Sequence, residues 1–241
     1  MDLWGPCEPA GLNGERFGLH FEEKRGRFSR SYATITKSTR ALMCRWEQVV
    51  AWSKAQTGND VKRITADGDF DMHEMKQWCS RNGVELCLTE RDSSADNPIA
   101  ERHGGTSQSR VHALMQGCRL PAEFWPLALE TADHVKNRTP CRSKTGEVRT
   151  PYEIVYGCKP HIGNLKVFGC RMYAKIVPEP PKSARFTAAR GVAGVMVGYA
   201  DRVTGTNISD THMRRGYKMY VEETGKIIHT RNARFLEDVR L

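Results

Sequence analysis

The sequence predicts a molecule in two parts, an α/β domain followed by a smaller all-β domain. In the first 137 residues, short strand-like runs alternate with stretches of helical periodicity, which is typical of an α/β sheet. From residue 151 onward, strand-like runs follow one another and only one short helical pattern occurs. The charged, turn-rich stretch between the two parts predicts a linker over residues 138–150.

The elements of the first part can be placed in order. Residues 39–57 carry Leu42, Trp46 and Val49 at helical spacing, and Gly58 follows as a helix stop. The other predicted elements are a strand at 61–67 that ends in the acidic loop DGDFD, a helix at 72–82, a strand at 84–89, and helices at 106–118 and 121–137. Pro126 lies inside the last helix and predicts a kink there.

The second part reads as a small basic β-barrel. Residues 151–157, with Pro at the start and Gly at the end, predict a short helix. Strand-like runs follow at 165–177, at 192–200 and at 217–235, the last as a hairpin that turns at residues 223–225.

The positive charge of the chain is concentrated in its last third. The whole chain has 37 Lys and Arg against 28 Asp and Glu, a net charge of +9. Residues 159–241 hold 15 of these basic residues and 7 of the acidic ones, so +8 of the excess lies there. Such a balance predicts an acidic partner, with nucleic acid first, because phosphate neutralisation dominates that kind of binding. A merely soluble basic surface is an equally good interpretation of composition alone.

Several protein classes are disfavoured. Eight scattered cysteines include no C-x-x-C pair and no Cys/His cluster at ligand spacing, so we expect no zinc site. The chain has no run of 18 apolar residues, and its N-terminus lacks the basic and apolar regions of a secretion signal. We therefore expect a soluble, intracellular protein with reduced thiols and no membrane contact.

Three acidic residues stand out once the elements are ordered. Asp2 opens the chain, Asp67 follows a predicted strand, and Glu101 lies near the start of a helix. Three carboxylates that converge from separate elements can hold two divalent metal ions, which activate a hydroxyl or water for attack on a phosphodiester. Carboxylate oxygens suit magnesium or manganese. By spacing alone, solvated loop carboxylates are the better interpretation.

The residues around these carboxylates form recognisable motifs. D-L-W-G-P at 2–6, T-A-D-G at 65–68 and N-P-I-A-E-R at 97–102 occur in the order seen in integrases of copia-type LTR retrotransposons. The similarity continues through LPAEFWPLALETADHVKNRTP (120–140), TPYEIVYGCKPHIGNLKVFGCRMYA (150–174), GVMVGYA (194–200) and GYKMYVEETGKIIHTRNARF (216–235). The chain therefore resembles the integrase region of a copia-type Pol polyprotein over nearly its whole length.

This resemblance implies a fold and an activity. Residues 1–137 are expected to form an RNase H-like integrase core, truncated at its N-terminus, and residues 151–241 an SH3-like basic barrel. By position in the motifs, Asp2, Asp67 and Glu101 correspond to the catalytic carboxylates, which in the family bind two Mg²⁺ (or Mn²⁺) ions for 3′-end processing and strand transfer. The implied partner is DNA, the implied assembly a homo-oligomer, and the implied location of a functional protein the nucleus.

The sequence departs from the family pattern near the expected site. The strand that carries the first Asp in the family would precede Asp2, so this residue is expected to be poorly held. D-G-D-F-D replaces the family's D-N-G-G-E-F, and the 33 residues between Asp67 and Glu101 are fewer than in the family. Paired glycines at 104–105 weaken a helix by about 1 kcal/mol each. A central apolar strand of the family is replaced here by FEEKRGRFSRSY (21–32). Together these changes predict a degraded copy of the integrase.

Further side chains have two interpretations each. Asp69 and Asp71 could serve as substitute metal ligands and His103 could support Glu101, but solvated surface groups are preferred. The aromatic residues Phe168, Tyr173, Tyr217 and Tyr220 could stack on bases, although core packing is preferred. The expected phosphate contacts, against the alternative of a solvated basic face, are Lys159, Lys166, Arg171, Lys175, Lys182, Arg185, Arg190, Arg214 and Arg215.

The predicted function is therefore DNA integration by a degraded two-metal D, D, E site. The alternative is a catalytically dead remnant that binds nucleic acid through the basic C-terminal part, and for present-day activity this alternative is preferred. It predicts salt-sensitive binding that does not depend on Asp67. A third interpretation makes the barrel a protein-interaction module of the ancestral polyprotein.

Overall fold

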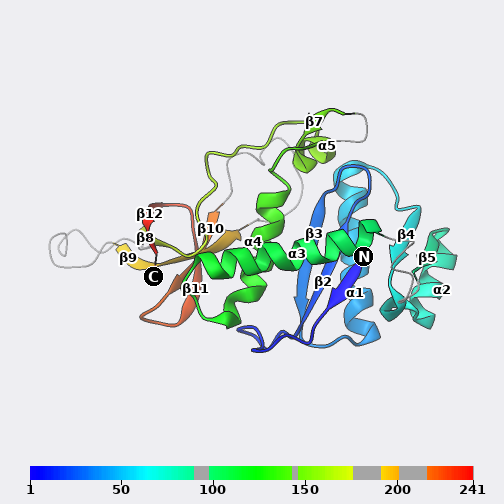
Figure 1. Ribbon diagram of the computed structural model, residues 1–241, viewed down its shortest axis with the longest axis horizontal. Coiled ribbons are helices and arrows are strands. Elements are labelled where there is room, and N and C mark those ends of the chain that lie inside the picture. Colours follow the sequence, from blue (N-terminus) through cyan, green and yellow to red (C-terminus); the bar gives the residue numbers. More distant parts are fainter. Residues whose placement is uncertain (90–97, 143–145, 176–190, 201–215, 241) are drawn as a thin grey trace.

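The structure, a computed structural model, describes residues 1–89, 98–142, 146–175, 191–200 and 216–240 (Figure 1). For residues 98–106 and 239–240 it describes the backbone only. The first part of the chain contains β1 (Asp2–Trp4), β2 (Phe17–Glu22), β3 (Ser29–Thr34), α1 (Thr39–Thr57), β4 (Arg63–Ala66), the 3₁₀ helix η1 (Gly68–Phe70), α2 (His73–Asn82), β5 (Glu85–Leu88), α3 (Pro98–Gly117), η2 (Ala122–Phe124) and α4 (Trp125–Lys136). The second part contains β6 (Cys141–Arg142), β7 (Val148–Arg149), α5 (Pro151–Tyr156), β8 (Cys170–Lys175), β9 (Gly191–Ala200), β10 (Gly216–Val221), β11 (Lys226–Thr230) and β12 (Ala233–Arg240).

The strands of the first part form two sheets that meet beside the N-terminus (Figure 1). β1, β2 and β3 form an antiparallel sheet in that order, with Asp2 paired to His20, whereas β4 and β5 pair in parallel. The Met1 amino group donates a hydrogen bond to the Thr65 carbonyl oxygen at 2.8 Å, which sets β1 beside β4. The prediction of an α/β first part is confirmed.

Helix α1 spans the residues that the sequence predicts, because both of its ends are capped. The Ser38 hydroxyl accepts a hydrogen bond from the Ala41 N–H, and Gly58 ends the helix in the left-handed conformation, at φ 69°. Leu42 and Trp46 are buried against apolar side chains of β2, β4 and α2. This first core positions the ends of β1 and β4.

Two helix predictions are wrong. The kink expected at Pro126 is absent, because α4 begins at Trp125 and a proline in the first turn sacrifices no helical hydrogen bond. α3 runs from Pro98 to Gly117, so it begins well before residue 106 and continues through the paired glycines at 104–105. None of the described helices is both long enough and apolar enough to span a membrane.

The segment 21–32, expected to be a degraded strand, takes part in a regular hairpin. β2 and β3 pair along their whole length, from Phe17 opposite Thr34 to Glu22 opposite Ser29. Polar residues are accommodated here because they have polar partners. The Ser29 hydroxyl accepts from Lys136 Nζ of α4, the Ser29 N–H donates to Asn137 Oδ1, and the Ser31 hydroxyl lies 2.8 Å from His20 Nδ1 on the neighbouring strand. The apolar pattern expected of a central strand was therefore the wrong criterion.

The described C-terminal strands form a sheet that is not closed, so the predicted barrel is not confirmed. Their order is β11-β10-β9-β8-β12, and all described pairings between them are antiparallel. β11 and β12 lie at opposite edges with three strands between them, and no pairing among the described residues joins these edges. A barrel requires that closure. The predicted strands themselves are present, and the hairpin turns at residues 222–225 as expected.

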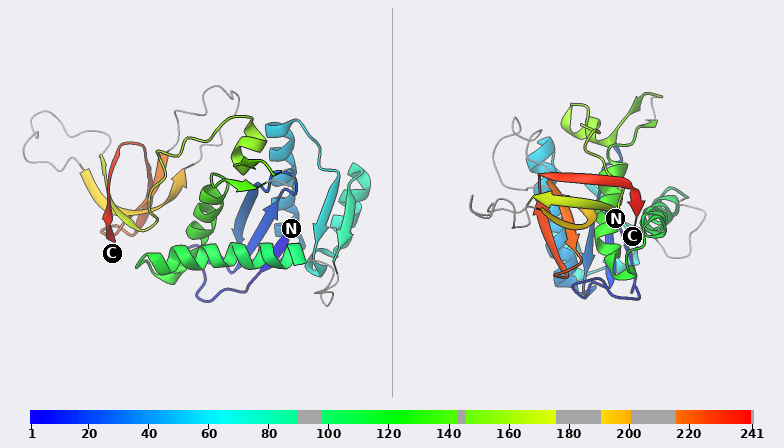
Figure 2. Two further views of the ribbon diagram at one scale, coloured as in Figure 1. Left: turned by 45° about the horizontal axis from the view of Figure 1, so that its top comes forward. Right: turned by 90° about the vertical axis from the view of Figure 1, so that its left-hand side faces the viewer.

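Helix α4 joins the sheet to the α/β part (Figure 2). Its buried residues share one core with Val195 and Val197 of β9. The His134 ring stacks on Tyr199 with centroids 3.8 Å apart, and the Phe124 ring meets Tyr220 edge-on at 4.9 Å. Because these contacts come from both parts of the chain, the two parts pack as one body.

One glycine makes the close approach between the parts possible. Gly169 has φ 81°, and a Cβ atom built on it would lie 2.2 Å from Cys118 Cβ, just after α3. Only glycine fits at this position, which lies within the L-K-V-F-G-C motif.

Helix α5 packs on the α/β part although it follows the predicted linker. The Tyr152 N–H donates to the Asn137 carbonyl oxygen at 2.8 Å, and the Tyr156 ring meets the Phe28 ring at 6.0 Å. The short β6–β7 hairpin occupies the linker region. The boundary at 138–150 stays a prediction.

Candidate functional site

Two of the three predicted carboxylates lie at one edge of the strands. Asp2 opens β1, where it is paired with His20 rather than poorly held as the sequence suggested. Asp67 follows β4 directly and caps η1, and its Oδ1 accepts a hydrogen bond from the Asp69 N–H at 3.2 Å. Phe70, only 1% exposed, anchors this acidic loop in the core. Strand pairing thus holds the backbone at Asp2, and loop anchoring together with the Asp69 N–H holds the Asp67 carboxylate.

The electrostatics of this edge favour a cation. Burial, followed by the charges of Asp69 and Asp2, raises the pKa of Asp67 from 3.8 to about 6. The hydrogen bond from Asp69 N–H opposes this shift but does not cancel it. Carboxylates that repel one another are stabilised in their charged forms by a divalent ion, and these hard oxygen donors suit Mg²⁺ or Mn²⁺. Asp2 and Asp67 therefore offer the kind of donor that the metal implied by the resemblance prefers.

The third carboxylate belongs to a stretch without described side chains. Glu101 lies near the start of α3, and its side chain and that of His103 fall outside the described residues. Both figures show the start of α3 next to the N-terminus, the end of the molecule where β1 and β4 meet. Among the described side chains, no group of three or more His, Cys, Asp or Glu is placed to hold a metal. Glu101 as a ligand stays a prediction.

Lys24 is a candidate that sequence reasoning missed. Its Nζ donates to Thr65 Oγ1 at 3.0 Å, two residues before Asp67. The two residues are 41 positions apart in the sequence, so no local pattern connects them. Asp69, interpreted as a solvated acid, instead acts electrostatically on Asp67, and Asp71 forms an ion pair with Lys76.

Of the nine predicted phosphate contacts, two form ion pairs with acidic side chains, two are exposed and five lie outside the described residues. Lys166 Nζ lies 2.7 Å from Glu237 Oε1, and Arg171 forms an ion pair with Glu222. Lys159 and Lys175 are exposed. The remaining five, which lie outside the described residues, are Lys182, Arg185, Arg190, Arg214 and Arg215.

An exposed aromatic residue distinguishes one face of the C-terminal sheet. Phe168 is buried, and Tyr217 and Tyr220 pack against Phe235 and Phe124, but the Tyr173 side chain is 45% exposed. In the register Tyr173 lies opposite Arg234, and Arg171 lies opposite Leu236, so these side chains share a face with Lys175. We call this surface the β8–β12 face, with residues Arg171, Tyr173, Lys175, Arg234 and Leu236.

The cysteines form no cluster. All eight are free thiols, and they are distributed over both parts of the molecule. Burial raises the pKa of the Cys170 thiol to about 11, so this cysteine is an inert core group at neutral pH.

The chain is 25% identical over 239 residues to the "Retrovirus-related Pol polyprotein from transposon TNT 1-94" of Nicotiana tabacum, an alignment that covers 98% of this chain and 17% of the polyprotein. Two further relatives of this chain are also transposon Pol polyproteins. Those named RE2 and RE1 of Arabidopsis thaliana are 24% identical over 115 and 113 residues, about half of this chain and 8% of each polyprotein.

The chain therefore spans a small part of the Pol polyproteins that it matches. The recognition of a Pol region from the sequence motifs is confirmed by these relatives. No protein-family model matches the sequence. Among solved structures, the Pol-related chain is similar to the "catalytic core domain of BIV integrase", with a TM-score of 0.43 and 16% identity over 65% of this chain and 92% of that one.

Proposed function

We propose that this Pol-related chain is an integrase region whose Asp2, Asp67 and Glu101 act together in polynucleotidyl transfer on DNA. The observation that carries the proposal is the meeting of Asp2 and Asp67 at one strand edge, with the pKa of Asp67 raised to about 6. A carboxylate shifted this far by burial and like charge is a candidate for a functional site. The start of α3, which bears Glu101, lies at the same end of the molecule (Figure 1).

Asp2, Asp67 and Glu101 are the residues that would hold Mg²⁺ or Mn²⁺. When bound, such ions lower the pKa of an attacking hydroxyl and stabilise charge on the leaving oxygen of a phosphodiester. The chain's own contribution is to hold the two aspartates in place. The β1–β2 register holds Asp2, and the buried Phe70 and the Asp69 N–H hold Asp67. Lys24, hydrogen-bonded beside Asp67, adds a positive charge that can orient a phosphate.

A strand-transfer assay with the full chain, oligonucleotide ends and Mn²⁺ or Mg²⁺ tests the proposal. We expect Asp67→Asn to reduce product formation at least about a hundredfold, because a neutral amide is a poor ligand for a divalent cation. Asp71→Asn is the matched control, since Asp71 lies in the same acidic loop but is paired with Lys76. Transfer that persists in Asp67→Asn would contradict the assignment.

A second candidate function is nucleic-acid binding without catalysis, through the β8–β12 face. It is favoured by the exposed Tyr173 ring beside Arg234, since an aromatic ring next to a cation can stack on a base while the cation meets a phosphate. We expect Tyr173→Ala and Arg234→Gln each to weaken binding of a fluorescent oligonucleotide at low salt, whereas Lys37→Gln, an exposed change on the α/β part, leaves it unaltered. Binding that survives in Asp67→Asn but fails in Tyr173→Ala would assign it to this face.

A further inference from the structure

A cavity of about 620 Å³ has a lining that includes neither Asp2 nor Asp67. It is open to solvent on one side and is bordered by α3, α4, the β2–β3 hairpin, the start of β6 and the start of α5. Its walls are mainly apolar and include Leu114, Ala132, Val135, Pro140 and Pro151. The volume falls within the range of about 300–1,000 Å³ that is common for small-molecule sites.

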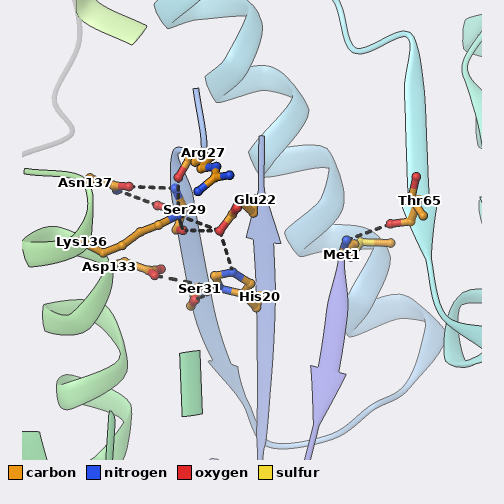
Figure 3. Close-up of polar contacts among 10 residues, drawn as sticks. All are labelled: Met1, His20, Glu22, Arg27, Ser29, Ser31, Thr65, Asp133, Lys136 and Asn137. Atoms are coloured by element: carbon orange, nitrogen blue, oxygen red, sulfur yellow. Dashed lines mark hydrogen bonds and ion pairs between the residues drawn. The ribbon is translucent and has the colours of Figure 1, made fainter. Parts of the chain in front are cut away.

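Four charged residues line this cavity, and two of them neutralise each other. Lys136 Nζ lies 2.7 Å from Glu22 Oε2 and also donates to the Ser29 hydroxyl and the Arg27 carbonyl oxygen (Figure 3). Lys136 and Glu22 are mostly buried, with side-chain exposures of 12% and 14%. Burial lowers the pKa of Lys136, and the charge of Glu22 opposes that shift. This pair forms a fixed wall that has little remaining charge for a ligand.

The other two charged residues, Arg27 and Arg110, have guanidinium groups without a close acidic partner. Within the described part of the chain, neither group makes a hydrogen bond or an ion pair, although the charge of Arg110 does act on the buried Asp133 at longer range. Arg27 also has φ 56°, a left-handed conformation that costs a non-glycine residue roughly 1 kcal/mol. Its backbone is held there by Lys136, which donates to its carbonyl oxygen.

We propose that this cavity binds a small amphipathic organic anion. The head group, a carboxylate or sulfonate, is recognised by Arg27 and Arg110, because a guanidinium offers a planar pair of donors that matches such a group. The apolar body lies against Leu114, Val135 and Pro151. The lining contains three cations and one carboxylate, so an anion meets a net attraction, whereas a cation does not.

The shape and composition of the cavity favour a small molecule over a nucleic-acid strand. A phosphate backbone brings no hydrocarbon to cover the apolar walls, and its bases would need polar partners that these walls lack. The cavity lining includes neither Asp2, Asp67 nor any residue of the β8–β12 face, so the proposal stands independently of the function proposed above.

Two matched probes test the charge requirement by titration calorimetry on the full chain. 8-Anilino-1-naphthalenesulfonate and the uncharged N-phenyl-1-naphthylamine share the same aromatic body and differ in the sulfonate. We expect the sulfonate to bind at least about tenfold more tightly, which is the scale of one charge-assisted contact. Equal affinity of the two probes would overturn the proposal.

Two variants test whether the sulfonate probe binds in this cavity. We expect Arg110→Gln to weaken sulfonate binding by roughly fivefold or more, with an unchanged melting temperature because this side chain lies partly exposed on α3. Arg119→Gln, an exposed arginine just after α3, is the control and should bind as the unsubstituted chain does. Amide chemical-shift changes on binding should cluster at residues 110–114 and 132–136. Unaltered binding by Arg110→Gln, or shift changes only elsewhere, would assign the probe to another surface and contradict the proposal.

Discussion

The two ends of the molecule differ in how their charged side chains are arranged. The α/β part has a net charge near zero, yet it brings Asp2, Asp67 and Asp69 together at one edge, where they repel one another. The C-terminal sheet is strongly basic in sequence, yet several of its described cations are paired, as in Lys166 with Glu237, Arg171 with Glu222 and Lys218 with Glu130. Net charge therefore does not show where like charges meet in the fold.

The two ends of the molecule pack as parts of one body, and a large-to-small change in their shared core tests this. Leu129 on α4 is fully buried in the cluster that includes Val195 and Val197 of β9. We expect Leu129→Ala to lower the free energy of unfolding by about 3 kcal/mol through lost packing and a residual cavity. Urea unfolding followed by far-UV circular dichroism and by tryptophan fluorescence should shift together. Separate transitions would show that the two parts unfold independently.

The next largest change in the free energy of unfolding is expected at a buried acid inside the α/β part. Asp133 on α4 is 5% exposed, its Oδ1 lies 4.0 Å from His20 Nδ1, and that nitrogen is 2.8 Å from the Ser31 hydroxyl (Figure 3). Burial raises the pKa of Asp133, and the charge of His20 opposes the shift. The folded state thus binds its proton more tightly than the unfolded state, so stability falls as pH rises above the ordinary carboxyl pKa.

We therefore expect Asp133→Asn to raise the free energy of unfolding at pH 7 by about 1–2 kcal/mol. The gain should be smaller at pH 4, near the ordinary carboxyl pKa, because the raised pKa of Asp133 favours uptake of a proton by the folded unsubstituted chain as pH falls. Urea midpoints at the two pH values measure it. A loss of stability at pH 7 would mean that the His20 contact outweighs the cost of burying the charge.

The pKa of Asp67, at the strand edge that it shares with Asp2, should affect stability in the same direction as that of Asp133, but less. The pKa of Asp67 is raised to about 6, so in the absence of metal its contribution to stability is lost as pH rises from about 4 to about 6. We expect Asp67→Asn to gain about 1 kcal/mol at pH 7.5, a value reduced by solvent screening of this half-exposed group. Thermal unfolding at pH 5 and pH 7.5 in a chelator checks it. The same gain at both pH values would remove the electrostatic explanation.

The smallest effect is expected at the paired basic end. Arg171→Gln removes one partner of an ion pair whose side chains are 31% and 40% exposed, and such pairs contribute under about 1 kcal/mol. Its effect on oligonucleotide binding should be weaker than that of Arg234→Gln, because Arg171 is already engaged by Glu222. A larger loss of oligonucleotide binding in Arg171→Gln than in Arg234→Gln would show that the ion pair with Glu222 does not keep Arg171 from binding nucleic acid.

The sequence predicts those features that local chemistry determines. Ser38 and Gly58 define α1, and the strand before Asp67 is evident from VKRITAD. The β2–β3 hairpin was misjudged because Ser29 and Ser31 look unsuited to a buried strand until Asn137 and His20 are seen to satisfy them. The open sheet and the place of Lys24 beside Thr65 depend on contacts between distant segments, which no periodicity reports.

The single body built around α4 also fixes a distance. In Figure 1 strands β8 and β12 lie toward one end of the longest axis and strands β1 and β4 toward the other, with α3 and α4 between them. Because α4 packs against both parts, the separation between the two ends is fixed and does not change by a hinge motion. A nucleic acid that touches both ends of one copy must run along the whole molecule, and a shorter one can reach both kinds of surface only by bridging two copies.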